Sequence, residues 1–217
     1  MNLTEPAGKI RVFIIDDHAI VREGVKQILA DTGDLELAGD SANSLDAIRM
    51  ARQKGFDVLL LDISMPDKSG IEILKQMRKE APDIPVLILS MHREDQYAIR
   101  TLKAGAAGYL NKQSAPNELV GAIREVVAGR KYINKEVAQA LANQVSGDHL
   151  AAPHETLSDR EYQTLTMIAS GKCVSDIGKE LNLSVKTVSM YRARLLQKMK
   201  LKNNAELMHY AMKNKLV

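Results

Sequence analysis

The sequence predicts an α/β domain built on a doubly wound, five-stranded parallel sheet, followed by an all-α domain of four helices. Two observations predict the sheet: short unbroken apolar runs, which strands covered on both faces require, and amphipathic stretches between these runs. A third observation predicts the change of class, because the alternation of strand and helix ends at Gly129. With 217 residues, the chain has room for two domains of ordinary size.

Five segments have the composition of buried strands, and we expect strands at 10–16, 35–39, 57–62, 85–90 and 107–111. The amphipathic stretches that follow them predict helices at 19–31, 44–54, 70–80, 94–104 and 116–129. The helix at 70–80 has apolar residues every three positions, and it should stop at Ala81 because the residue before Pro82 is pushed out of the helical region.

Beyond Gly129 the sequence predicts a linker over 130–156, with a short helix at 135–144 and a flexible hinge at 146–156, where polar, Gly and Pro residues gather. Ser158 and Glu161 have the spacing of a capping box, so a helix should begin at Asp159. The same periodicity gives the four helices of the second domain, at 159–169, 174–181, 185–199 and 205–214.

The composition limits where the chain works. No apolar stretch approaches the roughly 20 residues that cross a bilayer, so we expect no membrane partner. Residues 1–9 lack the basic and then apolar pattern of an export signal. Cys173 is the only cysteine, which excludes an internal disulfide and fits a reducing compartment. A cytoplasmic protein with an exposed or half-buried thiol is expected.

Polar side chains stand where four of the predicted strands end. Asp16 and Asp17 follow the first strand, Asp62 ends the third, Ser90 ends the fourth and Lys112 follows the fifth. The carboxyl ends of parallel strands meet in one crevice, so these groups should gather there. Three carboxylates at close range repel one another unless a cation neutralises them, and Mg²⁺ suits carboxylates, water and a phosphoryl group. Such a pocket suits phosphoryl transfer, with one carboxylate as nucleophile.

Residues 10–129 resemble the receiver domain of bacterial two-component response regulators, a flavodoxin-like fold, over the whole domain and with its characteristic spacing. The resemblance implies that Asp62 is the phosphoacceptor. It also implies a magnesium site made by Asp16, Asp17, Asp62 and the backbone carbonyl of Ser64.

The same resemblance gives roles to three further residues of the pocket. Ser90 is the switch hydroxyl that turns toward the phosphoryl group, Lys112 pairs with that group, and Tyr109 is the aromatic side chain whose rotamer follows. His18 lies beside the pocket, where we expect it to start a helix rather than to act as a general base.

Two alternatives to a phosphorylated receiver stay open at this point. A phosphohydrolase of the haloacid dehalogenase type would want a second acid two residues after the nucleophile, where this chain has Ser64. A phosphorylation-independent DNA-binding or interaction protein with a receiver fold would normally have lost an acidic residue or the lysine, and neither is lost here.

The last third of the chain carries the basic charge. From Leu150 to Val217 there are 11 Lys and Arg against 6 Asp and Glu, while the rest of the chain has a net charge of −2. Residues 181–202 contain six basic residues and no acidic one, and a face of one sign predicts a polyanionic partner. Two helices joined by a short turn, the second of them basic, predict a helix-turn-helix.

Residues 157–217 resemble the four-helix effector domain of NarL-type, or LuxR-type, transcription regulators (the NarL/FixJ family). The resemblance rests on Leu157-Ser158-x-Arg160-Glu161, Gly171, Ile177, Leu181, Leu183-Ser184 and Thr187-Val188. By position, it implies that Ser189, Met190 and Ala193 face the bases, with Lys186 and Thr187 near the backbone. Many relatives carry lysines at the positions of Ser189 and Ala193, so base recognition here should depend on apolar contacts such as those of Met190, or on water.

Phosphate contacts are expected to dominate the affinity for DNA, from Lys186, Arg192, Arg194 and Lys198. The last helix has more apolar surface than a lone domain requires, and in this family it is the dimer face. The two resemblances together imply a response regulator, not a dedicated enzyme, that accepts phosphate from a sensor histidine kinase. As a homodimer it would bind double-stranded DNA and regulate transcription, with RNA polymerase as a further partner to consider.

Overall fold

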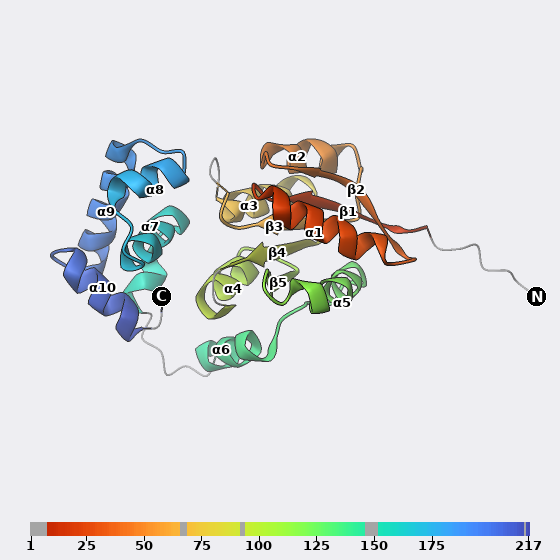
Figure 1. The fold of residues 1–217 in the computed structure, drawn as a ribbon. Coiled ribbons are helices and arrows are strands. Elements are labelled where there is room, and N and C mark those ends of the chain that lie inside the picture. The colour runs from red at the N-terminus through yellow and green to blue at the C-terminus, as the bar shows by residue number, and fades with distance from the viewer. Residues whose placement is uncertain (1–7, 66–68, 92–93, 146–151, 215) are drawn as a thin grey trace, which may run out of the picture. The chain divides into compact units, whose positions relative to one another are not determined.

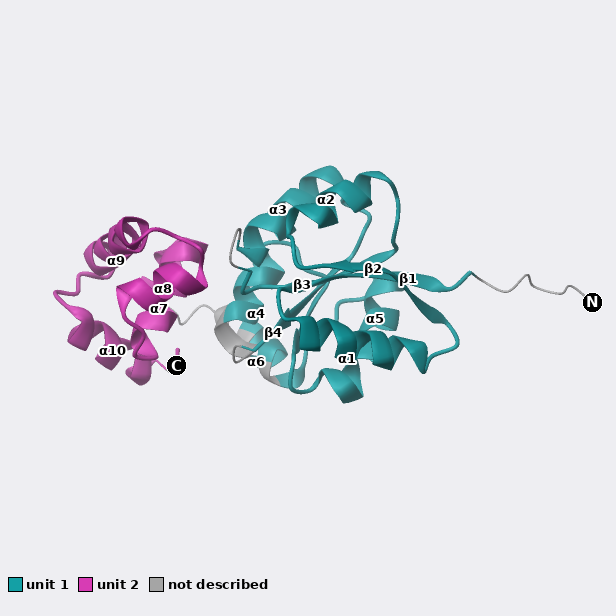
Figure 2. Ribbon diagram, turned by 45° about the horizontal axis from the view of Figure 1, so that its top comes forward, with its two compact units in different colours: residues 1–142 teal, residues 143–217 magenta. Residues whose placement is uncertain are grey.

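The computed structural model describes residues 8–65, 69–91, 94–145, 152–214 and 216–217. The chain divides into two compact units, 1–142 and 143–217, which Figure 2 shows in two colours. Within the described ranges, no helix has the length and apolar character that crossing a membrane requires.

The first unit contains the predicted parallel sheet, with five strands in the order β2-β1-β3-β4-β5 (Figure 1). The strands are β1 (Ile10–Ile15), β2 (Leu35–Ser41), β3 (Val58–Asp62), β4 (Val86–Ser90) and β5 (Gly108–Asn111). Since all pairings are parallel, the carboxyl ends of the strands lie at one edge. The central strand is β3, so its last residue, Asp62, lies between the ends of β1 and β4.

Helices cover both faces of this sheet, as the doubly wound prediction requires. They are α1 (Ala19–Ala30), α2 (Leu45–Arg52), α3 (Gly70–Glu80), α4 (Glu94–Lys103) and α5 (Ala115–Val127). One face packs against α1 and α5 through a fully apolar cluster that includes Val12, Ile14 and Leu60. Alternate residues of β1 point the other way, and the ring of Phe13 stacks on Phe56 at 5.2 Å. The helix bounds agree with the predictions to within two residues.

The second strand is longer than its apolar residues predict. It continues past residue 39 to Ser41, and Asp40 pairs in register with Ile14. A carboxylate is tolerated there because two cations of α1 neutralise it: Arg22 Nε lies 2.8 Å and Lys26 Nζ 3.0 Å from its oxygens. These ion pairs allow the strand to continue through a charged residue, which an apolar pattern does not reveal.

The second unit is helical, as predicted. After α6 (Lys135–Val145), which crosses the boundary between the units, its elements are a 3₁₀ helix η1 (Pro153–Thr156), α7 (Asp159–Ala169), α8 (Val174–Glu180), α9 (Val185–Met199) and α10 (Asn204–Lys213). The capping box is present: Glu161 N donates to Ser158 Oγ, and Ser158 N donates to the Glu161 carboxylate.

The structure differs from the predicted hinge in its last four residues, which form η1. His154 is buried there, with its Nδ1 2.8 Å from the Tyr210 hydroxyl and its ring edge-on to the Tyr210 ring. Pro153, at the first helical position, has its φ preset for a helical turn. Thus 153–156 pack with the second unit, whereas residues 146–151 of the predicted hinge lie outside the described residues.

Candidate functional site

The ends of three strands bring two carboxylates and an ammonium together. Asp16 follows β1 and Asp62 ends β3, and these strands are adjacent because Ile15 pairs with Leu61. Lys112 follows β5, and its Nζ lies 2.7 Å from Asp16 Oδ2 and 2.8 Å from Asp62 Oδ2. All three side chains are at most 5% exposed. The three charged side chains therefore form a compact, buried cluster at the edge of the sheet where the strands end.

The electrostatics of this cluster show a shortage of positive charge. Burial is the main cause that raises the pKa of Asp62, and the Asp16 carboxylate raises it further against the opposing effect of Lys112. Burial also opposes the charge on Lys112, but Asp62 and Asp16 outweigh that effect and raise the pKa of its ammonium. One ammonium thus serves two buried carboxylates, with Asp17 close by.

The donor set fits a divalent cation. Asp16, Asp17, His18 and Asp62 each offer a ligand atom, and these atoms all lie within 4.8 Å of one another. Two buried oxygens, Asp16 Oδ2 and Asp62 Oδ2, share the single ammonium of Lys112, so each keeps spare acceptor capacity. Buried carboxylate oxygens with spare acceptor capacity are what a hard cation such as Mg²⁺ needs.

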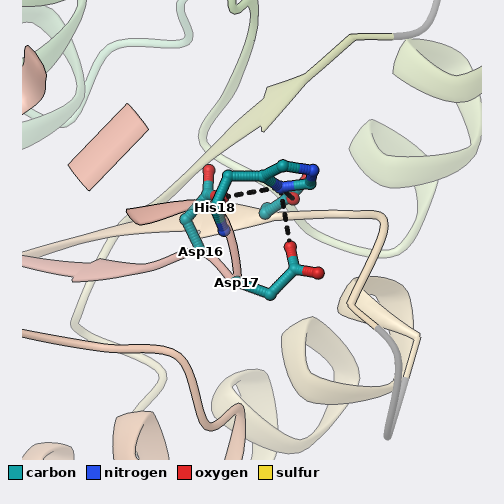
Figure 3. Close-up of side chains that lie close together, drawn as sticks. Asp16, Asp17 and His18 are labelled. Carbon is teal, nitrogen blue, oxygen red and sulfur yellow. Dashed lines mark hydrogen bonds and ion pairs between the residues drawn. The ribbon is translucent and has the colours of Figure 1, made fainter. Parts of the chain in front are cut away.

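His18 is more closely involved than its sequence position indicates. It is the N-cap residue of α1, as expected for a helix start, but its side chain makes no capping bond. The ring instead turns toward the carboxylates, with Nδ1 3.2 Å from Asp16 Oδ1 and 2.8 Å from Asp17 Oδ1 (Figure 3). The only sequence signal was its place directly after Asp16-Asp17.

The other predicted pocket residues lie around Asp62. Ser64 N donates to Asp62 Oδ1 at 3.1 Å. Ser90 is fully buried at the end of β4, and its carbonyl accepts from the backbone N–H of Lys112 at 2.9 Å. Tyr109 is buried in β5 and pairs in register with Ile88. Their places agree with the roles that the resemblance implies, and the roles themselves stay predictions.

The start of α3 approaches the end of β3 very closely. A Cβ on Gly70 would lie 2.4 Å from the carbonyl oxygen of Asp62 and 2.6 Å from Cα of Ile63. Gly70 N donates to the carbonyl of Ile63, and Ser69 caps the helix by accepting from Ile71 N. Only glycine permits this approach, so Gly70 fixes the backbone on which the Asp62 side chain stands.

In the second unit, α9 has one core side and one exposed basic side. The buried residues on its core side are Val188, Leu195, Leu196 and Met199. Six residues predicted to contact DNA are exposed: Lys186, Ser189, Met190, Ala193, Arg194 and Lys198. Ser184 caps the helix by accepting from Thr187 N at 3.0 Å, and Thr187 is half-buried.

The basic side chains of α9 fall into two groups. Arg192 Nε donates to Asn204 Oδ1 at 2.6 Å, and Lys198 Nζ lies 2.6 Å from Glu161 Oε2. Lys186 and Arg194 make no hydrogen bond or ion pair with their side chains in the described ranges. All four were predicted from the sequence as equivalent phosphate contacts, because a sequence pattern does not reveal that Arg192 and Lys198 have partners on α10 and α7.

Cys173 lies on the surface of the second unit, as expected. It is the N-cap residue of α8, and its Sγ lies 2.8 Å from Ser175 Oγ and 2.9 Å from Asp176 Oδ2.

A parallel sheet that ends in this acidic pocket, with a separate unit that carries a basic helix, defines a signal-controlled DNA-binding protein. Comparison with known families makes the class specific. Residues 12–124 match the response regulator receiver domain, and residues 155–211 match the bacterial regulatory proteins of the luxR family. The chain belongs to the NarL/LuxR-type response regulators, which join a receiver to a LuxR-type DNA-binding domain.

Curated relatives agree over nearly the whole chain. Response regulator UvrY of Escherichia coli (strain K12) is 38% identical over 208 residues, which cover 95% of each chain. Response regulator GacA of Pseudomonas aeruginosa is 37% identical over 209 residues, 96% of this chain and 98% of GacA.

Solved structures of response regulators align over nearly the whole chain. RcsB of Salmonella typhimurium aligns with a TM-score of 0.69 at 26% identity, over 95% of this chain and 98% of RcsB. A structure described as two RcsB dimers bound to two parallel DNAs aligns with a TM-score of 0.58 at 27% identity, over 94% of this chain and 98% of that one.

Proposed function

We propose that a sensor histidine kinase phosphorylates this response regulator on Asp62, and that the phosphoryl group controls dimerisation and sequence-specific binding to DNA. The observation that carries the proposal is the buried cluster of Asp16, Asp62 and Lys112, with its 2.7 and 2.8 Å contacts. A cluster of this charge would be costly as a purely structural device, since buried ion pairs add little net stability.

The chemistry assigned to Asp62 is nucleophilic attack on phosphorus. A carboxylate oxygen forms the new P–O bond while the P–N bond to the donor histidine breaks, and that histidine keeps the electron pair and takes up a proton. Lys112, 2.8 Å from Asp62, would pair with a phosphoryl oxygen. Mg²⁺ held by Asp16, Asp17, Asp62 and the Ser64 carbonyl would neutralise charge on the transferred group.

Ser90 and Tyr109 would convert this local charge into a change of conformation. The Ser90 hydroxyl, at the end of the strand beside β3, would donate to a phosphoryl oxygen, and the Tyr109 rotamer would follow. Contacts that exist only in the phosphorylated state shift the population toward the conformation that makes them. The protein acts as a switch in this scheme, without being a dedicated enzyme.

Phosphoryl uptake from a labelled histidine kinase or from acetyl phosphate tests the acceptor. Asp62→Asn should abolish uptake, whereas Asp31→Asn, the same substitution at an exposed site, should leave it unchanged. Label that persists in Asp62→Asn would show that another residue is the acceptor. If wild type takes up no label and beryllofluoride with Mg²⁺ leaves its DNA affinity unchanged, the phosphorylation-independent alternative holds.

For the DNA contacts, we propose that Lys186 and Arg194 bind phosphates and that Ser189, Met190 and Ala193 face the bases. Lys186 and Arg194 are exposed and their side chains have no partner among the residues that the structure describes, which supports the first part. The 40% exposure of Met190, an apolar side chain, supports the second. Thr187 lies near the DNA backbone. Arg192 and Lys198 contribute less, because Asn204 and Glu161 already bind them.

Binding should weaken steeply with salt, because each phosphate contact releases counterions. Lys186→Ala and Arg194→Ala should weaken binding to all duplexes by similar factors and reduce the salt slope. A loss confined to one sequence would contradict their assignment to phosphates.

For assembly, we propose that activation brings two copies together through α10. Met208 and Met212 are 37% and 67% exposed on this helix, and paired copies would cover them. A two-fold dimer matches a two-fold related DNA site. We also propose that the protein works in the cytoplasm, where it would meet chromosomal DNA.

A further inference from the structure

We propose that His18 is a nitrogen ligand of the acidic pocket, and that it gives the site a preference for first-row transition cations such as Co²⁺ over Mg²⁺. The inference rests on the proposed metal site and deepens it, by assigning the chemical class of cation that the pocket selects.

The position of the ring carries the argument. Nδ1 of His18 lies 2.8 Å from Asp17 Oδ1, 3.2 Å from Asp16 Oδ1 and 3.9 Å from Asp62 Oδ2. With metal–ligand bonds of about 2.1 Å, adjacent ligands of an octahedron are about 3.0 Å apart and opposite ligands about 4.2 Å. The distances from Nδ1 to the three carboxylate oxygens are therefore those expected between ligands of one cation.

The backbone holds His18 at this place. His18 N donates to Asp16 Oδ1 at 2.9 Å, and its carbonyl accepts from Val21 and Arg22 at the start of α1. An N-cap residue commonly turns its side chain back to the helix, but the His18 ring makes no such bond. The ring also stays 56% exposed, so a hydrated cation can reach it. Contacts with Asp16 and Asp17 turn the ring toward the pocket, and these contacts place Nδ1 where a ligand of a bound cation would lie.

An imidazole nitrogen is a softer donor than a carboxylate oxygen, and this decides which cations it favours. Mg²⁺ takes oxygen ligands and keeps several waters, so replacing one water by imidazole improves its binding little. Imidazole suits Fe²⁺, Co²⁺, Ni²⁺ and Zn²⁺, for which a nitrogen donor adds affinity. The two outermost residues of the set, Asp17 and His18, would then decide selectivity, while the buried Asp16 and Asp62 supply charge to any divalent cation.

Calorimetric titration of the full chain with CoCl₂ and, separately, with MgCl₂ tests this ligation in four variants. His18→Ala should weaken Co²⁺ binding by about tenfold and change Mg²⁺ binding far less. His18→Gln keeps a hydrogen-bond donor but removes the ring nitrogen, so it should behave like His18→Ala. His209→Ala removes an exposed histidine of α10 and should match wild type. Asp17→Asn should weaken the binding of both Co²⁺ and Mg²⁺.

Proton NMR of the Co²⁺ complex provides an independent readout, since a coordinated imidazole gives a strongly shifted, exchangeable N–H signal. This signal should be present in wild type and His209→Ala, and absent in His18→Ala. The inference is overturned if His18→Ala changes both affinities by the same factor, if His18→Gln keeps the wild-type ratio, or if wild type lacks the shifted signal. Phosphoryl uptake on Asp62 of the His18→Ala variant, measured in the presence of Mg²⁺, shows separately whether the proposed function holds.

Discussion

Lys198 on α9 and Glu161 on α7 form an ion pair with 2.6 Å between Nζ and Oε2. Glu161 also accepts from the backbone N–H of Ser158 at 2.8 Å, as the second half of the capping box. Burial opposes the charge on Glu161, but the Lys198 ammonium and the Ser158 bonds outweigh it and lower the pKa of this carboxyl. The helix that carries the basic residues is therefore tied to the first turn of α7 through a side chain that caps it.

Lys198 should consequently matter more for stability than for DNA affinity. Lys198→Met should lower the free energy of unfolding of the second unit by about 0.5–1 kcal/mol, a modest value because the lysine side chain is 43% exposed and water screens the pair. Lys186→Met, at an exposed position without a partner in the described structure, should leave stability unchanged and weaken DNA binding. Calorimetric unfolding and a DNA-binding titration of both variants measure the contrast. If Lys198→Met instead weakens DNA binding and leaves stability unchanged, Lys198 is a phosphate contact.

Removal of the Asp62 charge should stabilise the metal-free protein. Burial and Asp16 raise the pKa of Asp62 above its ordinary 3.8, so the folded state holds that proton more tightly than the unfolded state. Its contribution to stability is fully present below pH 3.8 and is lost as the pH rises through the folded pKa. An asparagine does not ionise, so Asp62→Asn does not lose stability by this route as the pH rises.

Melting curves across a pH series without Mg²⁺ measure this effect. The melting temperature of Asp62→Asn should exceed that of wild type by a margin that grows from about pH 4 upward. Asp31→Asn, at an exposed site, should track wild type throughout. A margin independent of pH would mean that the substitution acts through packing rather than through charge.

Magnesium should stabilise the first unit in proportion to its occupancy. At a free concentration of 100 times the dissociation constant, a cation bound only by the folded state adds about 2.7 kcal/mol. Asp17→Asn removes one proposed ligand without touching the buried pair, so a higher Mg²⁺ concentration should be needed for the same shift in melting temperature. NaCl at matched ionic strength controls for screening. An equal shift in wild type and Asp17→Asn would exclude Asp17 as a ligand.

Two glycine substitutions should act in opposite directions. Gly70→Ala places a Cβ against the backbone of Asp62 and Ile63, so we expect a loss of about 1–3 kcal/mol and slower phosphoryl uptake. Gly24→Ala lies within α1, and apart from the local helix backbone the new Cβ meets open space, so this variant should gain about 0.5–1 kcal/mol. Denaturant unfolding of both variants measures the sign. A neutral Gly70→Ala would show that α3 can move away without cost.

Two serines of α9 and its cap provide another matched pair. Ser184→Ala removes the side chain that accepts from Thr187 N, which should cost about 1 kcal/mol of stability. Ser189→Ala changes an exposed position within the helix, where alanine is the better helix former, and should cost nothing. Unfolding of the two variants under the same conditions separates loss of the cap from loss of a hydroxyl. Equal losses would contradict the capping role.

The sequence predicted the strands well because each buried strand is one apolar run bounded by a polar residue, as Val58–Asp62 illustrates. It also placed the start of α7 correctly, because a capping box is a local signal of two residues three positions apart. The edge strand β2 was predicted too short, because Asp40 depends on Arg22 and Lys26, cations that are distant along the chain.

The candidate site was predictable in its residues but not in its contacts. Strand ends indicated that Asp16, Asp62 and Lys112 would meet, because parallel topology alone brings them to one edge. The direction of the His18 ring and the pairing of Lys198 with Glu161 depend on rotamers and on how helices distant in sequence pack. No periodicity encodes them, and the same holds for the buried contact of His154 with Tyr210.

The exposed thiol of Cys173 makes the chain convenient for fluorescence work. Because it is the only cysteine in the sequence, a maleimide dye would attach at one defined position without any mutagenesis. That position is the N-cap of α8, in the same unit as the basic helix. Anisotropy of the labelled natural sequence would then follow tumbling of the effector unit as phosphate analogues and duplexes are added.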